Sequence, residues 1–282
     1  MGGGDAASVT PRLPIALTIA GSDSGGGAGI QADLKTFAAL GVYGASAITA
    51  ITVQNTQGVR AIHYPPPGIV GAQIEAVLED FPIGAIKIGM LGMAAIVEAV
   101  AESLLSPTRR GVRAFIIYDP VMIASSGDAL SGASFVETVR ASLLPLVNCL
   151  TPNLAEAAAL LGEPIARSEG DVARQGEALL KLGPRAVLMK GGHLESEEVI
   201  DLLVTEGGAH RFAAPRLASQ NLHGTGCTLS SAIAANIVLR MTLPEAVGAA
   251  KAFVSQAIER GREVALGSGA GPLIQTELYS KL

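Results

Sequence analysis

The sequence predicts an α/β protein in which a central, mostly parallel sheet lies between two layers of helices. Two observations lead to this prediction. Short runs rich in Val, Ile and Ala alternate with longer stretches rich in Ala, Leu and Glu, which is the pattern of βαβ units. The 282 residues are 49% hydrophobic but only 4% aromatic, with no tryptophan. The core must therefore consist of small aliphatic side chains, the usual filling of a buried parallel sheet.

The individual elements follow from these runs and from the glycines and prolines between them. Strands are expected at 15–20, 45–53, 85–88, 114–118, 148–150, 186–189 and 199–204, with a weaker one at 210–213. Helices are expected at 28–40, from Pro67 to 80, and at 94–105, 135–143, 154–161, 172–182, 225–239 and 244–263. No linker or internal repeat divides the pattern. We expect a disordered tail at 1–13 and a single domain at 14–282.

Composition excludes several functional classes. The net charge is −5 and no basic block occurs, which argues against a nucleic-acid partner. No apolar run approaches the roughly 18 residues of a membrane span, and the first residues lack the pattern of a signal peptide. Cys149 and Cys227 are far apart in sequence, so a disulfide framework is not expected and a reducing cytoplasm fits best.

A glycine-rich loop, Gly21-Ser-Asp-Ser-Gly-Gly-Gly-Ala-Gly-Ile-Gln-Ala-Asp33, follows the first expected strand. It satisfies a loose G-x-G-x-x-A pattern, but dinucleotide binding also needs an acidic residue about 20 residues further on. The second strand ends instead in the amides Gln54 and Asn55, so a nucleotide-dependent oxidoreductase is only a distant alternative. We interpret the loop as one that approaches a ligand, with Asp33 reaching the same pocket. A tight turn with close helix packing is the plainer alternative.

A second glycine-rich loop, Asn221-Leu-His-Gly-Thr-Gly-Cys-Thr228, opens a helix of small residues. The backbone amides of Gly224, Thr225, Gly226 and Cys227 would lie at the positive end of the helix dipole. Such amides form an anion hole suited to a phosphoryl group in transfer. The same dipole would favour the Cys227 thiolate. Cys149, in an apolar strand, has the pattern of a buried packing residue.

The segment His223-Gly-Thr-Gly-Cys-Thr228 resembles the anion-hole signature of ribokinase-like kinases. Most of these kinases have an Asp base where this chain has Cys227. The Cys form resembles the hydroxymethylpyrimidine kinases and one Cys-containing branch of pyridoxal kinases. The resemblance extends along nearly the whole chain, through Gly26-Gly-Ala-Gly-Ile-Gln-Ala-Asp-Leu-Lys-Thr36, Gln54-Asn-Thr56, Lys87-Ile-Gly-Met-Leu91, Asp119-Pro-Val-Met122, Thr151-Pro-Asn-Leu-Ala-Glu-Ala157 and Met189-Lys-Gly-Gly-His193.

This resemblance implies a ribokinase-like fold and an ATP-dependent kinase of thiamine biosynthesis. Its acceptors would be 4-amino-5-hydroxymethyl-2-methylpyrimidine and then the monophosphate of that compound. The residues implied to contact the pyrimidine are Gly21, Asp33, Gln54, Asn55, Met90 and Val121. The Gln54 amide can donate to a ring position and accept from the neighbouring amino group. Asp33 would lie near the hydroxymethyl group, whereas core packing is the alternative for Met90 and Val121.

The resemblance also implies a site for ATP and Mg²⁺. Asn153 and Glu156 match an N-x-x-E motif that acts on Mg²⁺ and its waters, and Asp119 would share this role. Capping of helices or turns is the alternative for such single carboxylates. Lys190 would neutralise the donor phosphates, and His223 would contact the same phosphates unless it has a structural role in its loop. A monovalent cation is left open, and a homodimer is implied by resemblance alone.

The implied reaction is in-line attack of the hydroxymethyl oxygen on the γ-phosphorus of Mg-ATP, with Cys227 accepting or relaying the proton. A pyridoxal kinase is the alternative within the same class. From a different class, the chain is interpretable as a catalytically silent sensor of the pyrimidine. The presence of Cys227, Asn153, Glu156 and Lys190 argues against a sensor, which would not need the residues of phosphoryl transfer.

Overall fold

The computed structural model describes residues 13–105, 114–122, 133–192 and 197–277. Residues 1–12 of the expected tail and His193 of the Met189–His193 motif lie outside these ranges, and the division into a tail and a single domain stays a prediction. The strands are β1 Ile15–Asp23, β2 Tyr43–Asn55, β3 Gly58–His63, β4 Ala85–Ile88, β5 Phe115–Tyr118, β6 Cys149–Leu150, β7 Ala186–Lys190, β8 Glu198–Thr205 and β9 Gly208–Pro215.

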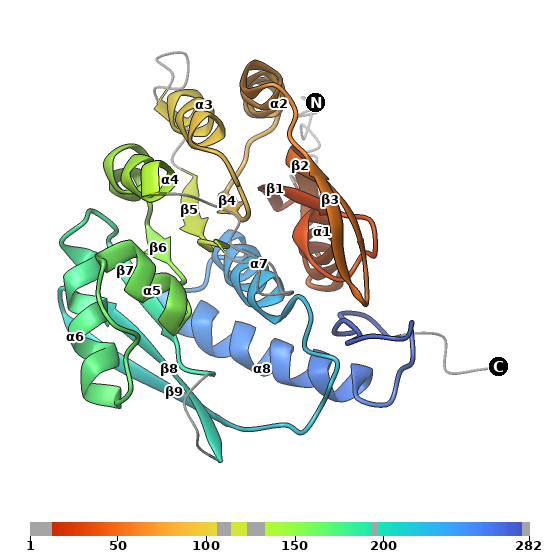
Figure 1. The fold of residues 1–282 in the computed structure, drawn as a ribbon, viewed down its shortest axis with the longest axis vertical. Coiled ribbons are helices and arrows are strands. Elements are labelled where there is room, and N and C mark those ends of the chain that lie inside the picture. The colour runs from red at the N-terminus through yellow and green to blue at the C-terminus, as the bar shows by residue number, and fades with distance from the viewer. Residues whose placement is uncertain (1–12, 106–113, 123–132, 193–196, 278–282) are drawn as a thin grey trace, which may run out of the picture.

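These strands form one sheet in the order β3-β2-β1-β4-β5-β6-β7-β8-β9 (Figure 1). The six from β2 to β7 in this order are mutually parallel, whereas β3 at one edge and β8 and β9 at the other run antiparallel to their neighbours. The mostly parallel sheet is therefore confirmed. The strand β3, which pairs with β2 across a short turn and has no buried residue, was not expected from the sequence.

Helices cover both faces of the sheet. They are α1 Gly29–Ala39, α2 Pro67–Asp80, α3 Ala94–Leu105, α4 Ala133–Thr138, α5 Leu154–Leu161, α6 Glu169–Leu180, α7 Thr225–Val238 and α8 Leu243–Gly261. After α4 the expected helix continues as a π-helical turn, Val139–Leu143, and a 3₁₀ turn that contains Pro145. Because proline lacks the backbone N–H of a helix interior, the chain leaves the helix there.

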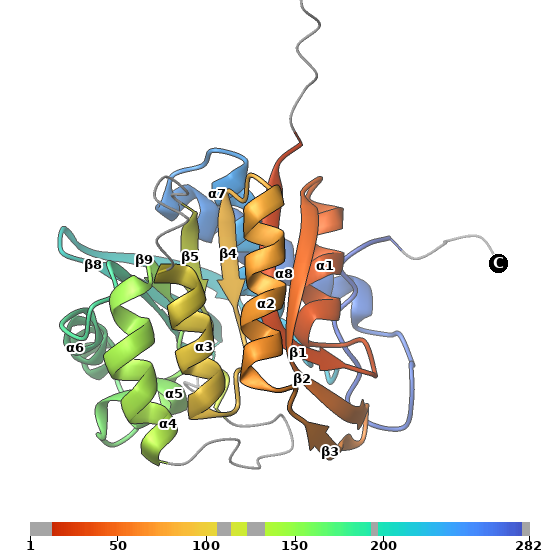
Figure 2. The same cartoon turned by 90° about the horizontal axis from the view of Figure 1, so that it is seen from above.

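Alternation along the central strands divides the core between the two faces. Leu17 and Ile19 of β1 pack with residues of α2, α3, α5 and α6, whereas Ala16 packs with residues of α1, α7 and α8. Figure 2 shows α2, α3 and α4 side by side over the first of these faces. The three-layer arrangement is thus confirmed, with a core of aliphatic side chains as the composition predicts.

Parallel strands bring the polar segments of the sequence to one edge of the sheet. Asp23 ends β1, Asn55 ends β2 and Lys190 ends β7, while Asp119 directly follows β5. Within the sheet, β2 lies on one side of β1 and β4 lies on its other side. The direction in which successive strands are added therefore reverses between β1 and β4. In such sheets, ligands bind outside the carboxyl ends of the strands at this reversal. Among the described helices, none is both long and apolar enough to cross a membrane.

Candidate active site

A cavity of about 1060 Å³ opens at the carboxyl edge of the parallel strands. Nearly all residues that the sequence analysis singled out line this cavity. On the side implied for the acceptor they are Gly21, Gln54, Asn55, Met90 and Val121, and at the start of α7 they are His223, Gly224, Thr225, Gly226 and Cys227. On the side implied for the donor they are Asp119, Asn153, Glu156 and Lys190. Asp33 is the exception.

The start of α7 meets the first glycine-rich loop at Gly224. This residue has φ = 86°, and a Cβ placed on it would overlap the carbonyl oxygen of Gly27. Only glycine tolerates both conditions. The Thr225 amide is engaged with the Leu222 carbonyl at 3.2 Å. Within the described chain, the amides of Gly224, Gly226 and Cys227 have no backbone acceptor, so three of the four expected amides are available to an anion.

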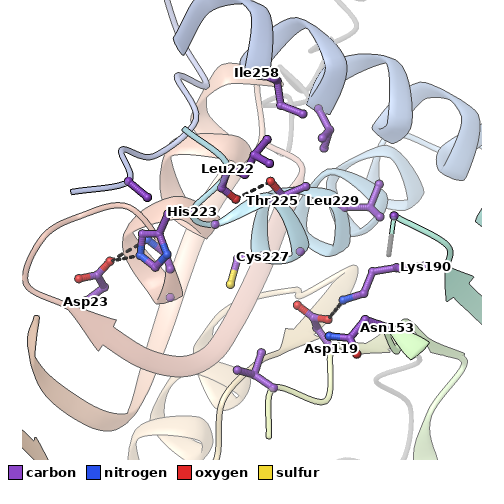
Figure 3. Close-up of a pocket in the computed structure, with 18 of the residues that line it drawn as sticks. Asp23, Asp119, Asn153, Lys190, Leu222, His223, Thr225, Cys227, Leu229 and Ile258 are labelled. Atoms are coloured by element: carbon purple, nitrogen blue, oxygen red, sulfur yellow. Dashed lines mark hydrogen bonds and ion pairs between the residues drawn. The ribbon is translucent and has the colours of Figure 1, made fainter. Parts of the chain in front are cut away.

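Cys227 lies between the His223–Asp23 contact and the Lys190–Asp119 ion pair, with its sulfur directed into the space between them (Figure 3). Burial raises the pKa of its thiol to about 11; Lys87 opposes this rise, Asp33 and Asp119 add to it, and a hydrogen bond from the Gly29 amide opposes it. The expectation that the helix dipole favours the thiolate is therefore wrong. Desolvation disfavours the charged form more than the helix start stabilises it.

Lys190 and Asp119 form an ion pair beside the first turn of α7. Lys190 Nζ lies 2.6 Å from Asp119 Oδ1 and 3.8 Å from Glu156 Oε2. A Cβ on Gly226 would lie 3.2 Å from Lys190 Nζ, so the ammonium borders the helix start directly. Burial works against this charge, but the two carboxylates raise the Lys190 pKa above its ordinary value. Lys190 therefore stays charged beside the free amides of α7.

Asn153 and Glu156 form a capping box at the start of α5. Asn153 Oδ1 accepts from the Glu156 amide at 2.9 Å, and Glu156 Oε2 accepts from the Asn153 amide at 2.7 Å. The capping alternative for this motif is thus correct, although both residues also line the cavity. Burial raises the Glu156 pKa to about 7; Lys190 opposes this rise and Asp119 adds to it.

His223 lies with the acceptor-side residues instead of the donor side. Its Nε2 is 3.1 Å from Asp23 Oδ2 and 3.1 Å from Gln54 Nε2, on the far side of Cys227 from Lys190 (Figure 3). The structure thus does not bring His223 together with Asn153, Glu156 and Lys190, as its expected contact with the donor phosphates requires. No local pattern in the sequence indicates this placement, because 169 residues separate His223 from Gln54.

Asp23 is a cavity residue that the sequence analysis did not select. Its carboxylate accepts from the amides of Gly25 at 2.8 Å, Gly27 at 3.0 Å and Ala28 at 2.9 Å. Burial alone would raise its pKa, but the bonds from His223, Gly25 and Ala28 lower it below its ordinary value. Asp23 therefore holds the first glycine-rich loop and stays ionised. The sequence feature that could have identified Asp23 is its place as an acidic residue at the end of a strand, directly before a run of glycines.

Asp33 lies behind the cavity wall and does not face the cavity. Its side chain is fully buried, and its oxygens accept from Lys87 Nζ at 2.8 and 2.9 Å, from Thr18 at 2.6 Å and from Ser231 at 2.6 Å. The expected direct contact with the substrate is corrected accordingly. A buried carboxylate requires a partner charge, and Lys87 supplies it. The overlooked signal was this lysine within the apolar strand Ala-Ile-Lys-Ile of β4.

Comparison with known proteins gives one consistent family. The model of the family "Phosphomethylpyrimidine kinase" matches residues 23–274. The hydroxymethylpyrimidine/phosphomethylpyrimidine kinase of Rhizobium meliloti is 52% identical over 259 residues, which are 92% of this chain and 96% of that protein. The crystal structure of phosphomethylpyrimidine kinase from Clostridium difficile 630 has a TM-score of 0.75 at 43% identity, with 88% of this chain and 100% of that chain covered.

Similarity extends to a solved structure of a pyridoxal kinase. The pyridoxal kinase of Staphylococcus aureus, in complex with AMP-PCP and pyridoxal, has a TM-score of 0.84 at 31% identity, and 94% of each chain is covered. Both solved structures thus share the α/β/α arrangement of this chain.

Proposed function

Because the chain belongs to the phosphomethylpyrimidine kinase family, we propose that it phosphorylates 4-amino-5-hydroxymethyl-2-methylpyrimidine and then the resulting monophosphate. ATP is the proposed donor and thiamine biosynthesis the proposed pathway. The observation that carries the proposal is the position of the α7 start. The free backbone amides of the α7 start and Cys227 lie in the middle of the cavity. The side-chain amide of Gln54 lines one side, and the charged side chains of Lys190, Asp119 and Glu156 line the other. An acceptor and a phosphate donor can therefore meet at one helix start.

The side of the cavity proposed for the pyrimidine combines apolar surfaces with the side-chain amide of Gln54, which can both donate and accept hydrogen bonds. A Cβ on Gly21 would lie 3.5 Å from Met90 Sδ, so backbone and thioether form adjoining surfaces for a flat ring. Val121 and Asn55 extend this wall. The Gln54 amide offers one acceptor and one donor, which match the amino group and neighbouring ring nitrogen of an aminopyrimidine.

The donor side supplies positive charge for the phosphates of ATP. Lys190 and the amides of Gly226 and Cys227 would neutralise the phosphoryl group in transfer. Mg²⁺ fits this side through water: Asp119 and Glu156 face the cavity with Lys190 between them, and Mg²⁺ characteristically keeps several waters and binds through few carboxylates. When bound, it would neutralise part of the charge of the donor phosphates.

The reaction forms a bond between the acceptor oxygen and the γ-phosphorus and breaks the bond to ADP. A pKa of about 11 leaves roughly one thiol in 10⁴ ionised at pH 7, so Cys227 starts the reaction protonated. The loose transition state of phosphoryl transfer requires little proton removal beforehand. The thiol can therefore act only as a relay: its sulfur takes the proton of the alcohol as the new bond forms, and its own proton passes to an oxygen of the transferred phosphoryl group. In the second phosphorylation, an ionised phosphate oxygen has no proton to lose.

A pyridoxal kinase is the second candidate function, favoured by the similarity to the Staphylococcus aureus enzyme. ADP release by the purified protein with Mg-ATP, offered hydroxymethylpyrimidine and pyridoxal in parallel, tests the choice. We expect kcat/KM to be at least about tenfold higher with the pyrimidine, the effect of one well-made hydrogen bond. A preference for pyridoxal would overturn the substrate while keeping the chemistry.

Cellular context and assembly complete the proposal. We propose a homodimer, supported by the family resemblance, and a cytoplasmic location, supported by two cysteines that are both free thiols in the structure. The single-domain organisation of residues 14–282 belongs to the same proposal, supported by a sheet that runs through all four described ranges.

A further inference from the structure

Three side chains from separate segments meet on the acceptor side of the cavity. Asp23 ends β1, Gln54 lies near the end of β2, and His223 precedes α7. The Nε2 atom of His223 lies 3.1 Å from Asp23 Oδ2 and 3.1 Å from the Gln54 amide. Figure 3 shows the imidazole turned toward Asp23 and away from the Lys190 side. One ring nitrogen therefore faces two partners, and its protonation decides what each partner can do.

The Asp23 contact requires a proton on His223 Nε2. Asp23 already accepts from three loop amides at 2.8 to 3.0 Å, so its carboxylate is held in the ionised form. An ionised carboxylate can only accept hydrogen bonds. The 3.1 Å contact is then satisfied only when Nε2 donates to Oδ2.

This proton determines the orientation of the Gln54 amide. A nitrogen that already carries a proton cannot accept from the amide nitrogen, so the orientation with Gln54 Nε2 toward His223 sets donor against donor. Turning the amide over exchanges oxygen and nitrogen at almost no change in shape. The oxygen then faces His223 and the nitrogen faces Thr52 Oγ1, which lies 3.1 Å from the amide. Thr52 Oγ1 donates to the Ser22 carbonyl at 3.0 Å and is free to accept, so this orientation satisfies the Gln54 amide, Thr52 Oγ1 and His223 Nε2.

We infer that Asp23 and His223 form a positioning relay that acts on the Gln54 amide. The relay fixes which end of the amide edge facing the substrate accepts a hydrogen bond and which end donates one. An aminopyrimidine presents an amino donor beside a ring-nitrogen acceptor. The corresponding 4-oxo ring, in its N–H form, presents an acceptor beside a donor. A locked amide pairs with only one of these two orders, whereas an amide free to turn over pairs with both. The relay thus selects the 4-amino ring, and this inference rests on the proposed function.

The experiment measures kcat/KM for hydroxymethylpyrimidine and for its 4-oxo analogue, with saturating Mg-ATP. We expect the wild-type protein to prefer the 4-amino ring. His223→Leu, which removes the donor, should lower this preference about tenfold or more, because one hydrogen bond then ceases to discriminate. His223→Gln can still donate from its amide and should retain most of the preference. KM for Mg-ATP should change less than about threefold, roughly 0.6 kcal/mol, in both variants.

Two control variants test whether the change in preference comes from the relay. In a Gln54→Ala background, His223→Leu should produce no further change in the preference, since its effect passes through Gln54. His210→Leu removes an exposed histidine outside the cavity and should leave the preference unchanged. If His223→Leu does not fold by circular dichroism, His223→Asn, whose side chain is too short to reach both partners, replaces it.

The outcomes separate the relay from the proposed function. Absence of ADP release by the wild-type protein with hydroxymethylpyrimidine would overturn the proposed function. With wild-type turnover established, an equal loss for both rings in His223→Leu would overturn the relay. A large rise in KM for Mg-ATP with an unchanged preference would also overturn it and would return His223 to the donor phosphates.

Discussion

Lys87 Nζ lies 2.8 and 2.9 Å from the two carboxylate oxygens of Asp33, and both side chains are fully buried. The pair joins β4 to α1, and Ser231 of α7 donates to the same carboxylate at 2.6 Å. Asp33, from behind the cavity wall, and Lys87, which lines the cavity, also act electrostatically on Cys227. This ion pair therefore connects β4, α1 and the middle of α7.

Lys87→Met should destabilise the protein strongly. The change leaves Asp33 as a buried charge without its partner, which typically costs about 3–5 kcal/mol. Urea denaturation followed by circular dichroism measures the free energy of unfolding. Lys87→Met combined with Asp33→Leu removes both charges and should recover much of the loss.

The surface provides the control for this prediction. Arg174 pairs with Glu163 at 2.9 Å, but both side chains are substantially exposed. Exposed pairs contribute about 0–1 kcal/mol, so Arg174→Met should change the free energy of unfolding by less than about 1 kcal/mol. Equal effects of Lys87→Met and Arg174→Met would contradict the structural role given to Lys87.

Gly224→Ala should lower turnover by about tenfold or more, because a Cβ at this position overlaps Gly27 and displaces the amides of the anion hole. Initial rates of ADP release measure the effect. Gly41→Ala is the matched control. Gly41 has φ = 75° and a Cβ added there would meet no atom within 4 Å, so its substitution costs only backbone strain of roughly 1–2 kcal/mol. Wild-type turnover in Gly224→Ala would exclude a close approach of the two loops.

Cys227→Ala should affect the two phosphorylations unequally. Loss of a group that accepts or relays a proton typically costs about 10²–10⁴-fold in turnover, and the alcohol acceptor should show such a loss. The monophosphate acceptor has no proton to remove and should lose less than about tenfold. Cys149→Ala changes a fully buried thiol outside the cavity and should leave the ratio of the two rates unchanged. Equal losses in Cys227→Ala would contradict a role in proton transfer.

Glu156 should give the reaction a pH dependence near neutrality. Burial raises its pKa to about 7, so its carboxylate forms between about pH 6 and 8. If Mg-ATP binding uses this carboxylate, kcat/KM for Mg-ATP rises with pH across this range. Glu156→Gln keeps a capping group for α5 but cannot ionise, and its profile should lack this rise. The same profile in both proteins would remove Glu156 from the donor site.

The same shift predicts a change in stability. The folded-state pKa of Glu156 lies above its ordinary value of 4.5. The stability contributed by its protonated form is therefore present below about pH 4.5 and is lost as the pH rises through about 7. Relative to the wild type, Glu156→Gln should gain free energy of unfolding between pH 6 and pH 8. Urea denaturation at the two pH values measures the difference.

Local signals in the sequence predicted the sheet and most of the cavity. Polar residues directly after apolar strands, such as Asp119 and Lys190, were found because parallel strands present their carboxyl ends at one edge. The glycines around Cys227 were found because they open a helix. The strand β3 was missed because an exposed edge strand carries little hydrophobic alternation.

Residues whose roles depend on distant partners could not be predicted in the same way. Asp33 was expected in the cavity, but its orientation is determined by Lys87, 54 residues away. His223 was expected beside the donor phosphates, but Asp23, 200 residues away, holds it on the acceptor side. The Cys227 pKa depends on burial by several segments, so the helix start alone predicted its direction incorrectly.

The central claim is that one cavity carries out two successive phosphorylations of a hydroxymethylpyrimidine. A ³¹P NMR time course with the purified protein, Mg-ATP and hydroxymethylpyrimidine tests it most directly. We predict that the signal of a phosphate monoester appears first and then gives way to the two signals of a pyrophosphate, with ADP formed at each step. Tight binding of the pyrimidine without any new phosphorus signal would contradict the claim and would identify the chain as a pyrimidine sensor.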